Sequence, residues 1–315
     1  MDVGLLVGRE RSFPEAFIKY VNSSNLGITA DMLSVGAVKA DELRRYKVII
    51  DRISHEIPFY RSYLKSAALT GTTIINNPFW WSADDKFFGT ALVNKLGLAI
   101  PKTVLLPQKG YKEDVWTESL SNLEYPLDWK AVLEYTGLPA IMKPYDGGGW
   151  KNVYKIHSME ELLEIYDKTH TVCMMLQEFI TFDRYVRCYT IGRKDVRIMP
   201  YDPSKPYLQQ QYFKDDSYLG KELQERVIRE CITLNDALGY DMNTAEFAIR
   251  DGIPYAIDFT NPAPDAGVES VGEDNQRWFI EKVADLCVRY CQGEHGPERK
   301  LQWHEFMSSK LAMAK

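Results

Sequence analysis

A lysine and three consecutive glycines stand close together in the segment PAIMKPYDGGGWKNVYK, residues 139–155. An apolar run ends at Lys143, and Gly147, Gly148 and Gly149 follow after three residues. Glycines inside a strand cost backbone entropy and pack nothing, so the run predicts a turn or a loop. One interpretation is a plain hairpin turn. The other is a flexible loop whose amides approach a phosphate, with Lys143 fixed on the strand before it.

Two carboxylates stand in a second segment, NTAEFAIRDGIPYAIDFTN, residues 243–261. The Asp251-Gly252 pair between two apolar runs predicts a hairpin turn, with Glu246 and Asp258 on its two arms. Two carboxylates placed side by side among apolar neighbours repel each other. A bound magnesium ion would remove that repulsion, because it prefers hard oxygen ligands. The alternative is that both side chains point to solvent.

The composition narrows the classes of protein. The chain has 315 residues, 45% of them hydrophobic and 26% charged, which is ordinary for a globular enzyme of two or three domains. A net charge of −6 argues against a nucleic-acid partner, and no apolar run approaches the ~20 residues of a membrane span. The five cysteines are scattered without a C-x-x-C pair, and the first residues lack a signal-peptide pattern. We therefore expect reduced thiols, a cytoplasmic location and no membrane partner.

Alternating apolar strands and amphipathic helices in the first third predict a parallel sheet with crossover helices. The strands expected there are 3–7, 28–38, 47–53 and 71–79, and the helices are 13–23, 40–46 and 83–97, the last capped by Ser82. The rest of the chain predicts a more mixed pattern of strands and helices. Its strands are 98–106, two strands flanking the glycine run, 172–180, 184–192 and the hairpin; its helices are 126–137, 158–169, 219–239 and 275–293.

Taken in order, five segments resemble the ATP-grasp enzymes, most of all the group with glutathione synthetase, the ribosomal-protein glutamate ligase and D-alanine ligase. The segments are ADDKFFGTALVNKLGLAIPKT with Lys86, AIMKPYDGGGWKNVYKI with Lys143, LQEFI, RYVRCYTIG with Arg187, and AEFAIRDGIPYAIDFTN. The resemblance covers residues 45–265 and lies in the order of the segments more than in any one of them.

The resemblance implies an ATP-grasp fold of mixed α/β and α+β class. Residues 1–105 would form an N-terminal Rossmann-like domain with an open parallel sheet, the pre-ATP-grasp domain. Residues 106–178 would form a small lid subdomain. Residues 179–315 would form a larger antiparallel subdomain that carries a metal site.

The resemblance also implies roles for single residues. Lys86 and Lys143 would neutralise the phosphates of ATP, the glycine loop would close over them, and Arg187 with Lys143 would act on the transferring phosphoryl group. The hinge that holds adenine would be Gln177, Glu178, Phe179 and Ile180. Asp183 would bind the ribose, although Tyr185 occupies the nearest matching position.

The metal ligands implied are Glu246, Asp258 and Asn261, with two magnesium ions expected and manganese as an alternative. In the family the asparagine usually stands two residues after the acid, whereas Asn261 stands three after Asp258. Thr260 is therefore the alternative third ligand.

The activity implied is an ATP-dependent carboxylate–amine ligase, which joins a small-molecule carboxylate and an amine through an acyl phosphate. The polar-aromatic segment 201–213 would face the cleft, which suggests an amino-acid or peptide-like substrate. Arg9, Asp51 and Arg52 stand near strand ends, where open α/β sheets bind ligands. The alternatives are a small-molecule kinase on the same fold and a nucleotide-binding regulatory protein, and a homodimer remains an option.

Overall fold

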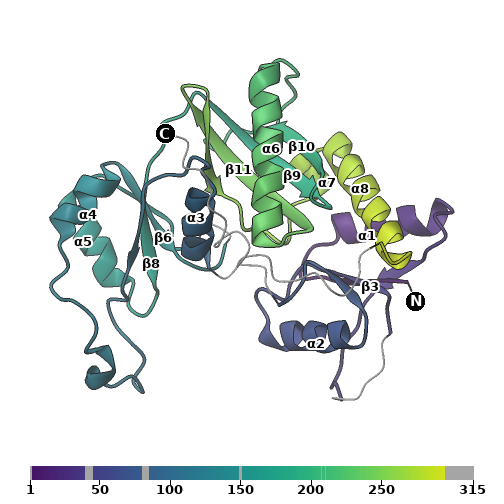
Figure 1. Ribbon diagram of the computed structural model, residues 1–315, viewed down its shortest axis with the longest axis horizontal. Coiled ribbons are helices and arrows are strands. Elements are labelled where there is room, and N and C mark those ends of the chain that lie inside the picture. Colours follow the sequence, from purple (N-terminus) through teal and green to yellow (C-terminus); the bar gives the residue numbers. More distant parts are fainter. Residues whose placement is uncertain are drawn as a thin grey trace.

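The computed structural model describes residues 2–39, 45–79, 85–148, 151–206, 208–209 and 211–294. The strands of these residues form three sheets of four strands each (Figure 1). The first sheet is parallel, and the other two are antiparallel. The predicted combination of an N-terminal parallel sheet with a mixed α+β remainder is thus confirmed.

The parallel sheet has the strand order β2-β1-β3-β4. Its strands are β1 (Val3–Leu6), β2 (Ala30–Met32), β3 (Val48–Asp51) and β4 (Thr73–Ile75), and its helices are α1 (Ser12–Ser23) and α2 (Pro58–Leu69). All residues of β1 and β3 are buried, as is usual for parallel strands covered on both faces. The sequence did not predict α2, whose only buried residue is Leu64, so it has hardly any apolar stripe to recognise.

The second sheet has the order β5-β8-β6-β7 and forms the small lobe of Figure 1. Its strands are β5 (Thr103–Leu106), β6 (Ala140–Pro144), β7 (Tyr154–Ile156) and β8 (Met174–Glu178); its helices are a 3-10 turn (Thr117–Leu120), α4 (Trp129–Thr136) and α5 (Met159–Lys168). Helix α5, predicted at 158–169, begins after Ser158, whose Oγ caps it by accepting a hydrogen bond from Glu161 N at 3.2 Å. Strand β5 lies in this sheet beside β8, although the predicted boundary at 105 separates most of β5 from the lid.

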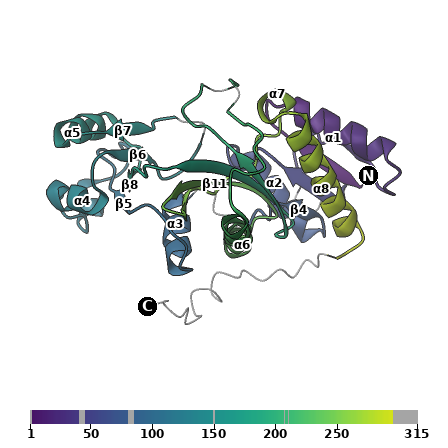
Figure 2. The same ribbon diagram turned by 90° about the horizontal axis from the view of Figure 1, so that it is seen from above.

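The third sheet has the order β10-β9-β11-β12, and helices cover both of its faces. Its strands are β9 (Arg184–Ile191), β10 (Asp195–Pro200), β11 (Met242–Arg250) and β12 (Ile253–Asp258). Figure 2 shows α3 (Lys86–Lys95) and α6 (Lys221–Leu238) on one side, with α7 (Val268–Val271) and α8 (Glu273–Cys291) on the other. Among the described residues, no helix is both long and apolar enough for a membrane span.

The parallel sheet and the third sheet share one hydrophobic core. Phe13 of α1 meets Phe279 of α8 with their ring centroids 5.0 Å apart, and Tyr189 of β9 packs on the same Phe279. Asn76, which follows β4, adds a polar link, because its side chain accepts hydrogen bonds from Asp241 N and Met242 N at 2.7 and 2.8 Å. These contacts join the two sheets; the domain boundaries at 105 and 178 stay predictions.

Candidate functional site

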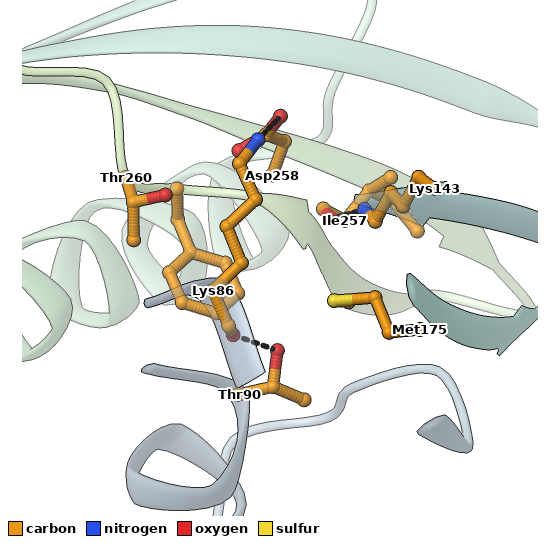
Figure 3. A pocket seen from close by; sticks show the side chains of 8 residues that line it. Lys86, Thr90, Lys143, Met175, Ile257, Asp258 and Thr260 are labelled. Atoms are coloured by element: carbon orange, nitrogen blue, oxygen red, sulfur yellow. Dashed lines mark hydrogen bonds and ion pairs between the residues drawn. The ribbon is translucent and has the colours of Figure 1, made fainter. Parts of the chain in front are cut away.

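A small pocket lies where the second sheet, helix α3 and the end of strand β12 meet (Figure 3). We call the second sheet the lid sheet, because most of it belongs to the predicted lid, and the apolar residues packed on it the lid core. Eight residues line the pocket: Lys86, Thr90, Lys143, Met175, Ile257, Asp258, Phe259 and Thr260. Successive side chains of β8 point to opposite faces of the sheet. Met175 therefore lines this pocket, while Met174 and Leu176 belong to the lid core. The pocket therefore gathers two lysines and one carboxylate that lie far apart in the sequence.

Lys86 enters the pocket from the first turn of helix α3. The helix begins there because Asp85 caps it, its carboxylate accepting a hydrogen bond from Phe88 N at 2.7 Å. The expected cap, Ser82, lies outside the described residues. Lys86 Nζ donates to Asp258 Oδ2 at 2.8 Å, and its side chain is only 12% exposed. Lys86 is thus an interior cation at this site and not a solvated surface charge.

Lys143 enters the pocket from strand β6, where its neighbour Met142 points into the lid core. Lys143 Nζ donates to the backbone carbonyl of Ile257 at 3.3 Å. Burial lowers the pKa of Lys143 from 10.5 to about 8; the nearby Lys86 lowers it as well, and Asp258 opposes both. Lys143 is therefore a cation that the protein holds at a cost and that an anion would stabilise.

This pKa predicts opposite pH dependences for ligand binding and for folding. Anion binding needs protonated Lys143, so we expect the affinity for Mg-ATP to fall, by at most tenfold per pH unit, as the pH rises above about 8. The unfolded chain keeps this proton up to about 10.5, so the contribution of Lys143 to the free energy of unfolding rises between those two values. Calorimetric titration measures the affinity and urea unfolding measures the free energy of unfolding, each at pH 7, 8 and 9. Lys143→Met should remove the contribution of this residue to both pH dependences.

The first two glycines of the run, Gly147 and Gly148, lie in an exposed segment between β6 and β7. Gly147 has a φ of +79°, a conformation that residues with side chains rarely adopt, and Gly148 is also exposed. Gly149 lies outside the described residues. The loop is tied to the pocket through its first residues, because Tyr145 O accepts a hydrogen bond from Lys86 N at 2.8 Å. The described glycines are not part of the pocket lining.

Three residues of the predicted adenine hinge already make hydrogen bonds within the protein. Gln177 is a buried sheet residue whose side chain donates to Thr103 Oγ1 at 3.0 Å. The amides of Glu178 and Phe179 donate to Lys102 O and Pro139 O. These two amides already have backbone acceptors, and the role of the segment as an adenine hinge stays a prediction.

The other polar groups of the predicted nucleotide site differ in how many hydrogen-bond partners they already have. The Glu178 carboxylate pairs with Arg250 at 3.2 Å and accepts a hydrogen bond from Lys102 N. Among the described residues, the Ile180 amide has no backbone acceptor. Asp183 is exposed and accepts a hydrogen bond from Asp251 N, at the turn end of the hairpin and away from the Glu246–Asp258 pair.

Glu246 and Asp258 face each other across the β11–β12 pair, as predicted, with a bulge after Glu246. The expected repulsion is absent because each carboxylate has its own cation. Lys86 pairs with Asp258 at 2.8 Å, and Arg187 Nη2 pairs with Glu246 Oε1 at 2.7 Å. Burial raises the pKa of Asp258, but Lys86 and Lys143 outweigh it and hold that pKa below its usual range.

The oxygen donors here fit a magnesium ion. Glu246 and Asp258 supply two carboxylates, and the buried Thr260 Oγ1 has no hydrogen-bond partner among the described residues. Thr260 lines the pocket, whereas Asn261 does not, so the geometry favours the threonine as the neutral donor. Among the described residues, no group of three or more His, Cys, Asp or Glu side chains is placed to hold a metal ion.

Arg187 lies on strand β9 between the Glu246 carboxylate and a group of tyrosines. Its Nη1 donates to Tyr212 Oη at 2.8 Å, and its guanidinium carbon lies 5.0 Å from the centroid of the Tyr201 ring. Its Nε is buried and has no hydrogen-bond partner among the described residues. The guanidinium thus keeps one unused donor beside Glu246.

The sequence did not indicate that Tyr185, Tyr201 and Tyr212 gather around Arg187 and Glu246. Tyr185 Oη donates to Glu246 Oε2, and Tyr201 and Tyr212 form an isolated bridge within the predicted cleft segment. The strand period of two could have indicated Tyr185, because it stands two residues before Arg187 and so on the same face of β9. The pairing of Tyr212 with Arg187 spans a loop and leaves no periodic signal.

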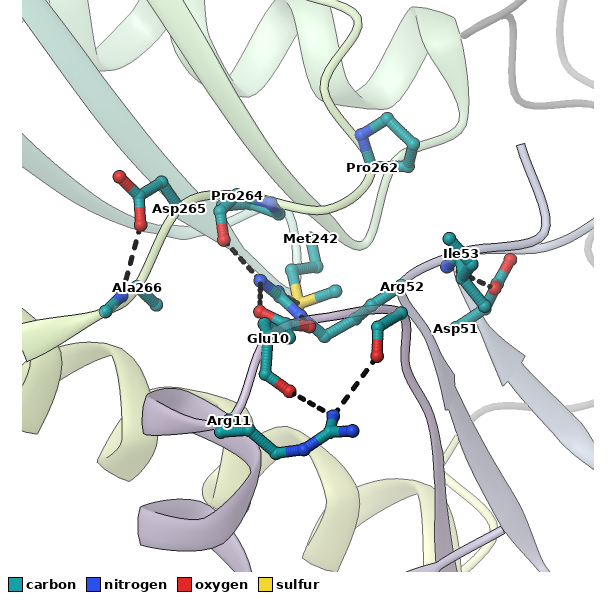
Figure 4. A network of polar contacts seen from close by, with 12 residues as sticks. Glu10, Arg11, Asp51, Arg52, Ile53, Met242, Pro262, Pro264, Asp265 and Ala266 are labelled. Atoms are coloured by element: carbon teal, nitrogen blue, oxygen red, sulfur yellow. Dashed lines mark hydrogen bonds and ion pairs between the residues drawn. The ribbon is translucent and has the colours of Figure 1, made fainter. Parts of the chain in front are cut away.

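Arg52, which the sequence places near a strand end where ligands bind, is buried and fully engaged within the protein (Figure 4). Its guanidinium pairs with both oxygens of Glu10, donates to Pro264 O and lies 4.7 Å from the centroid of the Phe13 ring. Asp51 is also buried and caps the turn after β3, accepting from Ser54 N at 2.9 Å. Arg9 is exposed. Arg52 thus fastens the parallel sheet to the loop that follows the β11–β12 hairpin.

We therefore expect Arg52→Met to lower the stability of the protein and not its affinity for a substrate. It removes charge-assisted hydrogen bonds to Glu10 and Pro264, so it should lower the free energy of unfolding by about 1.5–3 kcal/mol. Urea unfolding measures this loss, with Arg11→Met, an exposed neighbour, as the matched control. Unchanged stability together with a higher KM for a substrate would instead place Arg52 in the substrate site.

Comparisons with known proteins bear on the fold. The sequence matches no protein-family model and no curated protein. The structure is similar to D-alanine–D-alanine ligase from Bacillus anthracis complexed with ATP, with 16% identity, 94% of this chain and 100% of that chain covered, and a TM-score of 0.60. It is similar to a RimK domain ATP-grasp protein from Sphaerobacter thermophilus, with 14% identity, coverages of 92% and 99%, and a TM-score of 0.64.

A third similar structure is the ATP-grasp ligase PsnB complexed with a minimal precursor, Mg and ADP, with 13% identity, coverages of 92% and 98%, and a TM-score of 0.60. The likeness to all three extends over nearly the whole of each chain. The chain therefore has the ATP-grasp fold, as the order of its sequence segments predicted.

Proposed function

We propose that the protein is an ATP-dependent ligase that joins a carboxylate to an amine. The observation that carries the proposal is the meeting of Lys86 and Lys143, from two different elements, with Asp258 in one pocket at the junction of the lid and the third sheet. ATP needs cations at its phosphates and oxygen ligands for its metal ion. The similar structures of ligases complexed with ATP, or with Mg and ADP, support this interpretation.

The nucleotide would lie between the lid subdomain and the antiparallel subdomain. The proposal includes the predicted domain boundaries at residues 105 and 178. Lys86 and Lys143 would neutralise the α and β phosphates, and the loop at 147–149 would close over them. The hinge at 177–180 would receive adenine, with the Ile180 amide facing its edge. For the ribose we keep Asp183, which would have to move from its contact with Asp251 N.

The metal site would consist of Glu246 and Asp258, with Thr260 or Asn261 as the neutral ligand. Bound magnesium would supply positive charge at the β and γ phosphates. Two ions are expected, and manganese could replace magnesium. Because Lys86 pairs with Asp258 in the described structure, metal and nucleotide should bind together: the phosphates draw Lys86 away from Asp258 as the metal arrives.

The proposed reaction has two steps. A carboxylate oxygen of the substrate attacks the γ-phosphorus of ATP, the bond to the bridging oxygen breaks, and ADP leaves. The acyl phosphate is then attacked at its carbonyl carbon by an amine, which loses a proton and expels inorganic phosphate. The enzyme contributes charge neutralisation and alignment, with the guanidinium of Arg187 and the ammonium of Lys143 directed at the transferring group.

A kinase on the same fold is the second candidate, since phosphoryl transfer to a hydroxyl needs the same nucleotide site. Around the pocket described, the cations are Lys86, Lys143 and Arg187, and each already has a role toward ATP. No further basic cluster for a phosphorylated acceptor gathers there within the described residues. A regulatory protein without catalysis is less well supported, because the two lysines, the arginine and both carboxylates are all present.

The test is a screen for ADP release across pairs of amino acids and small peptides, with hydroxylamine as a trap. A ligase releases ADP only when a suitable carboxylate is present, and hydroxylamine converts its acyl phosphate to a hydroxamate. Mass spectrometry of the product then decides the class. A product that retains phosphate as an ester, with no amide or hydroxamate formed, would replace the ligase by the kinase.

A further inference from the structure

The two carboxylates of the proposed metal site are held in different ways. Both oxygens of Glu246 have partners on the adjacent strand β9: Arg187 Nη2 contacts Oε1 at 2.7 Å, and Tyr185 Oη donates to Oε2. Asp258 has one described partner, Lys86, which comes from helix α3 and contacts only Oδ2. The Glu246 side chain is 18% exposed and that of Asp258 is 37% exposed. Glu246 is thus the fixed carboxylate of the pair.

The strand register explains why Tyr185 reaches Glu246. Glu246 is paired directly with Arg187, and Tyr185 stands opposite Ala248, two residues further along β11. Such a diagonal neighbour lies about 7–8 Å away between Cα atoms, within reach of a tyrosine side chain. Arg187 and Tyr185 therefore approach Glu246 from two sides on one face of the sheet. Together they leave the carboxylate a single orientation.

The ring and the hydroxyl of Tyr185 have separable roles. The ring is buried at 6% exposure and packs against Phe182 and Tyr201, with centroid distances of 5.2 and 5.9 Å. The hydroxyl makes the contact with Glu246. The hydroxyl is the donor in this contact, because an ionised carboxylate has only acceptor oxygens. Removal of the oxygen alone would leave the ring packing in place.

We infer that Tyr185 is a positioning residue for the metal site: its hydroxyl fixes the Glu246 carboxylate so that the remaining lone pairs of that carboxylate face the divalent cation. This inference rests on the proposed function. It also gives Tyr185, which stands nearest to the family's ribose position in the sequence, a different task. Partners that orient a metal ligand typically contribute 10–100-fold to metal affinity.

The test is Mn²⁺ binding to the full chain, measured by electron paramagnetic resonance with saturating ADP. We expect Tyr185→Phe to weaken Mn²⁺ binding in the ADP complex by about 10–100-fold. Its affinity for ADP in the presence of EDTA should stay within twofold of that of the wild-type protein. Tyr166→Phe is the matched control, because Tyr166 is a buried lid tyrosine whose hydroxyl donates to a backbone carbonyl, Pro107 O, at 2.8 Å. It should leave Mn²⁺ binding unchanged.

A double variant tests whether Tyr185 acts through Glu246. If it does, Tyr185→Phe adds no further loss of Mn²⁺ affinity to Glu246→Gln, because the group that it orients is already altered. Additive losses would overturn the inference, as would full Mn²⁺ affinity in Tyr185→Phe. A loss of ADP affinity in EDTA would make Tyr185 a nucleotide contact instead. A wild-type protein that binds neither ADP nor Mn²⁺ at millimolar concentration would remove the proposed function itself, and the inference with it.

Discussion

Asp258→Asn should reduce magnesium-dependent ATP turnover by about 10³-fold or more, because the substitution removes the charge of a proposed metal ligand. Folding should be nearly unaffected. The asparagine oxygen can still accept the hydrogen bond that Lys86 Nζ now makes at 2.8 Å, so we expect a loss of about 1 kcal/mol in the free energy of unfolding. Steady-state ADP release and urea unfolding measure the two quantities on the same preparation.

The control for this prediction is Asp195→Asn. Asp195 forms an ion pair with Lys282 at 3.1 Å, and both side chains are about as exposed as Asp258, but the pair lies on β10 and α8, outside the pocket. Loss of that pair should affect stability slightly and turnover not at all. Near-normal turnover of Asp258→Asn would show that this carboxylate does not hold the metal.

The second large effect is expected for Lys143→Met, which should cost about 2–4 kcal/mol of transition-state stabilisation, as the loss of other fixed phosphate-directed donors does. The nucleotide-free protein should not lose stability. Burial lowers the pKa of Lys143 to about 8, so the folded chain holds the charged form against a penalty that methionine does not incur. We expect an equal or higher thermal midpoint without nucleotide and a smaller increase with Mg-ATP.

Lys168→Met provides the control for the loss of one lysine. Lys168 is an exposed residue of α5 that pairs with Glu164 at 2.6 Å, so its removal should change neither turnover nor nucleotide binding. Turnover of Lys143→Met within twofold of the wild-type value would contradict the assignment. A fall in its nucleotide-free midpoint would contradict the account of the buried charge.

The parts of the fold that could be predicted are those with a local signal. The buried strands at 3–6 and 48–51 are short apolar runs, α5 has its Ser158 cap, and the Asp251-Gly252 turn fixes the hairpin that sets Glu246 opposite Asp258. Each of these depends on residues close together in the chain. Helix α2 was missed because it buries only Leu64 and shows little periodicity.

The polar partners of the site could not be predicted, because they join elements distant in sequence. Lys86 meets Asp258 across 172 residues, and Arg52 meets Pro264 across 212. The prediction that the two carboxylates repel each other was wrong for this reason, because their counterions come from α3 and β9. Hydrophobic patterns place a strand in a sheet, but they carry no information on which charges the packing of separate layers brings together.

The most direct measurement of the central claim is the binding of Mg-ATP to the wild-type chain, followed by thermal unfolding and by calorimetric titration. We predict that millimolar Mg-ATP raises the unfolding midpoint, because a ligand that binds only the folded state stabilises it by mass action. Mg-GTP should raise it much less, since the proposed hinge at 177–180 would contact the adenine edge. Equal midpoints with and without Mg-ATP, together with no heat of binding, would contradict the claim that Lys86, Lys143 and Asp258 form a nucleotide site.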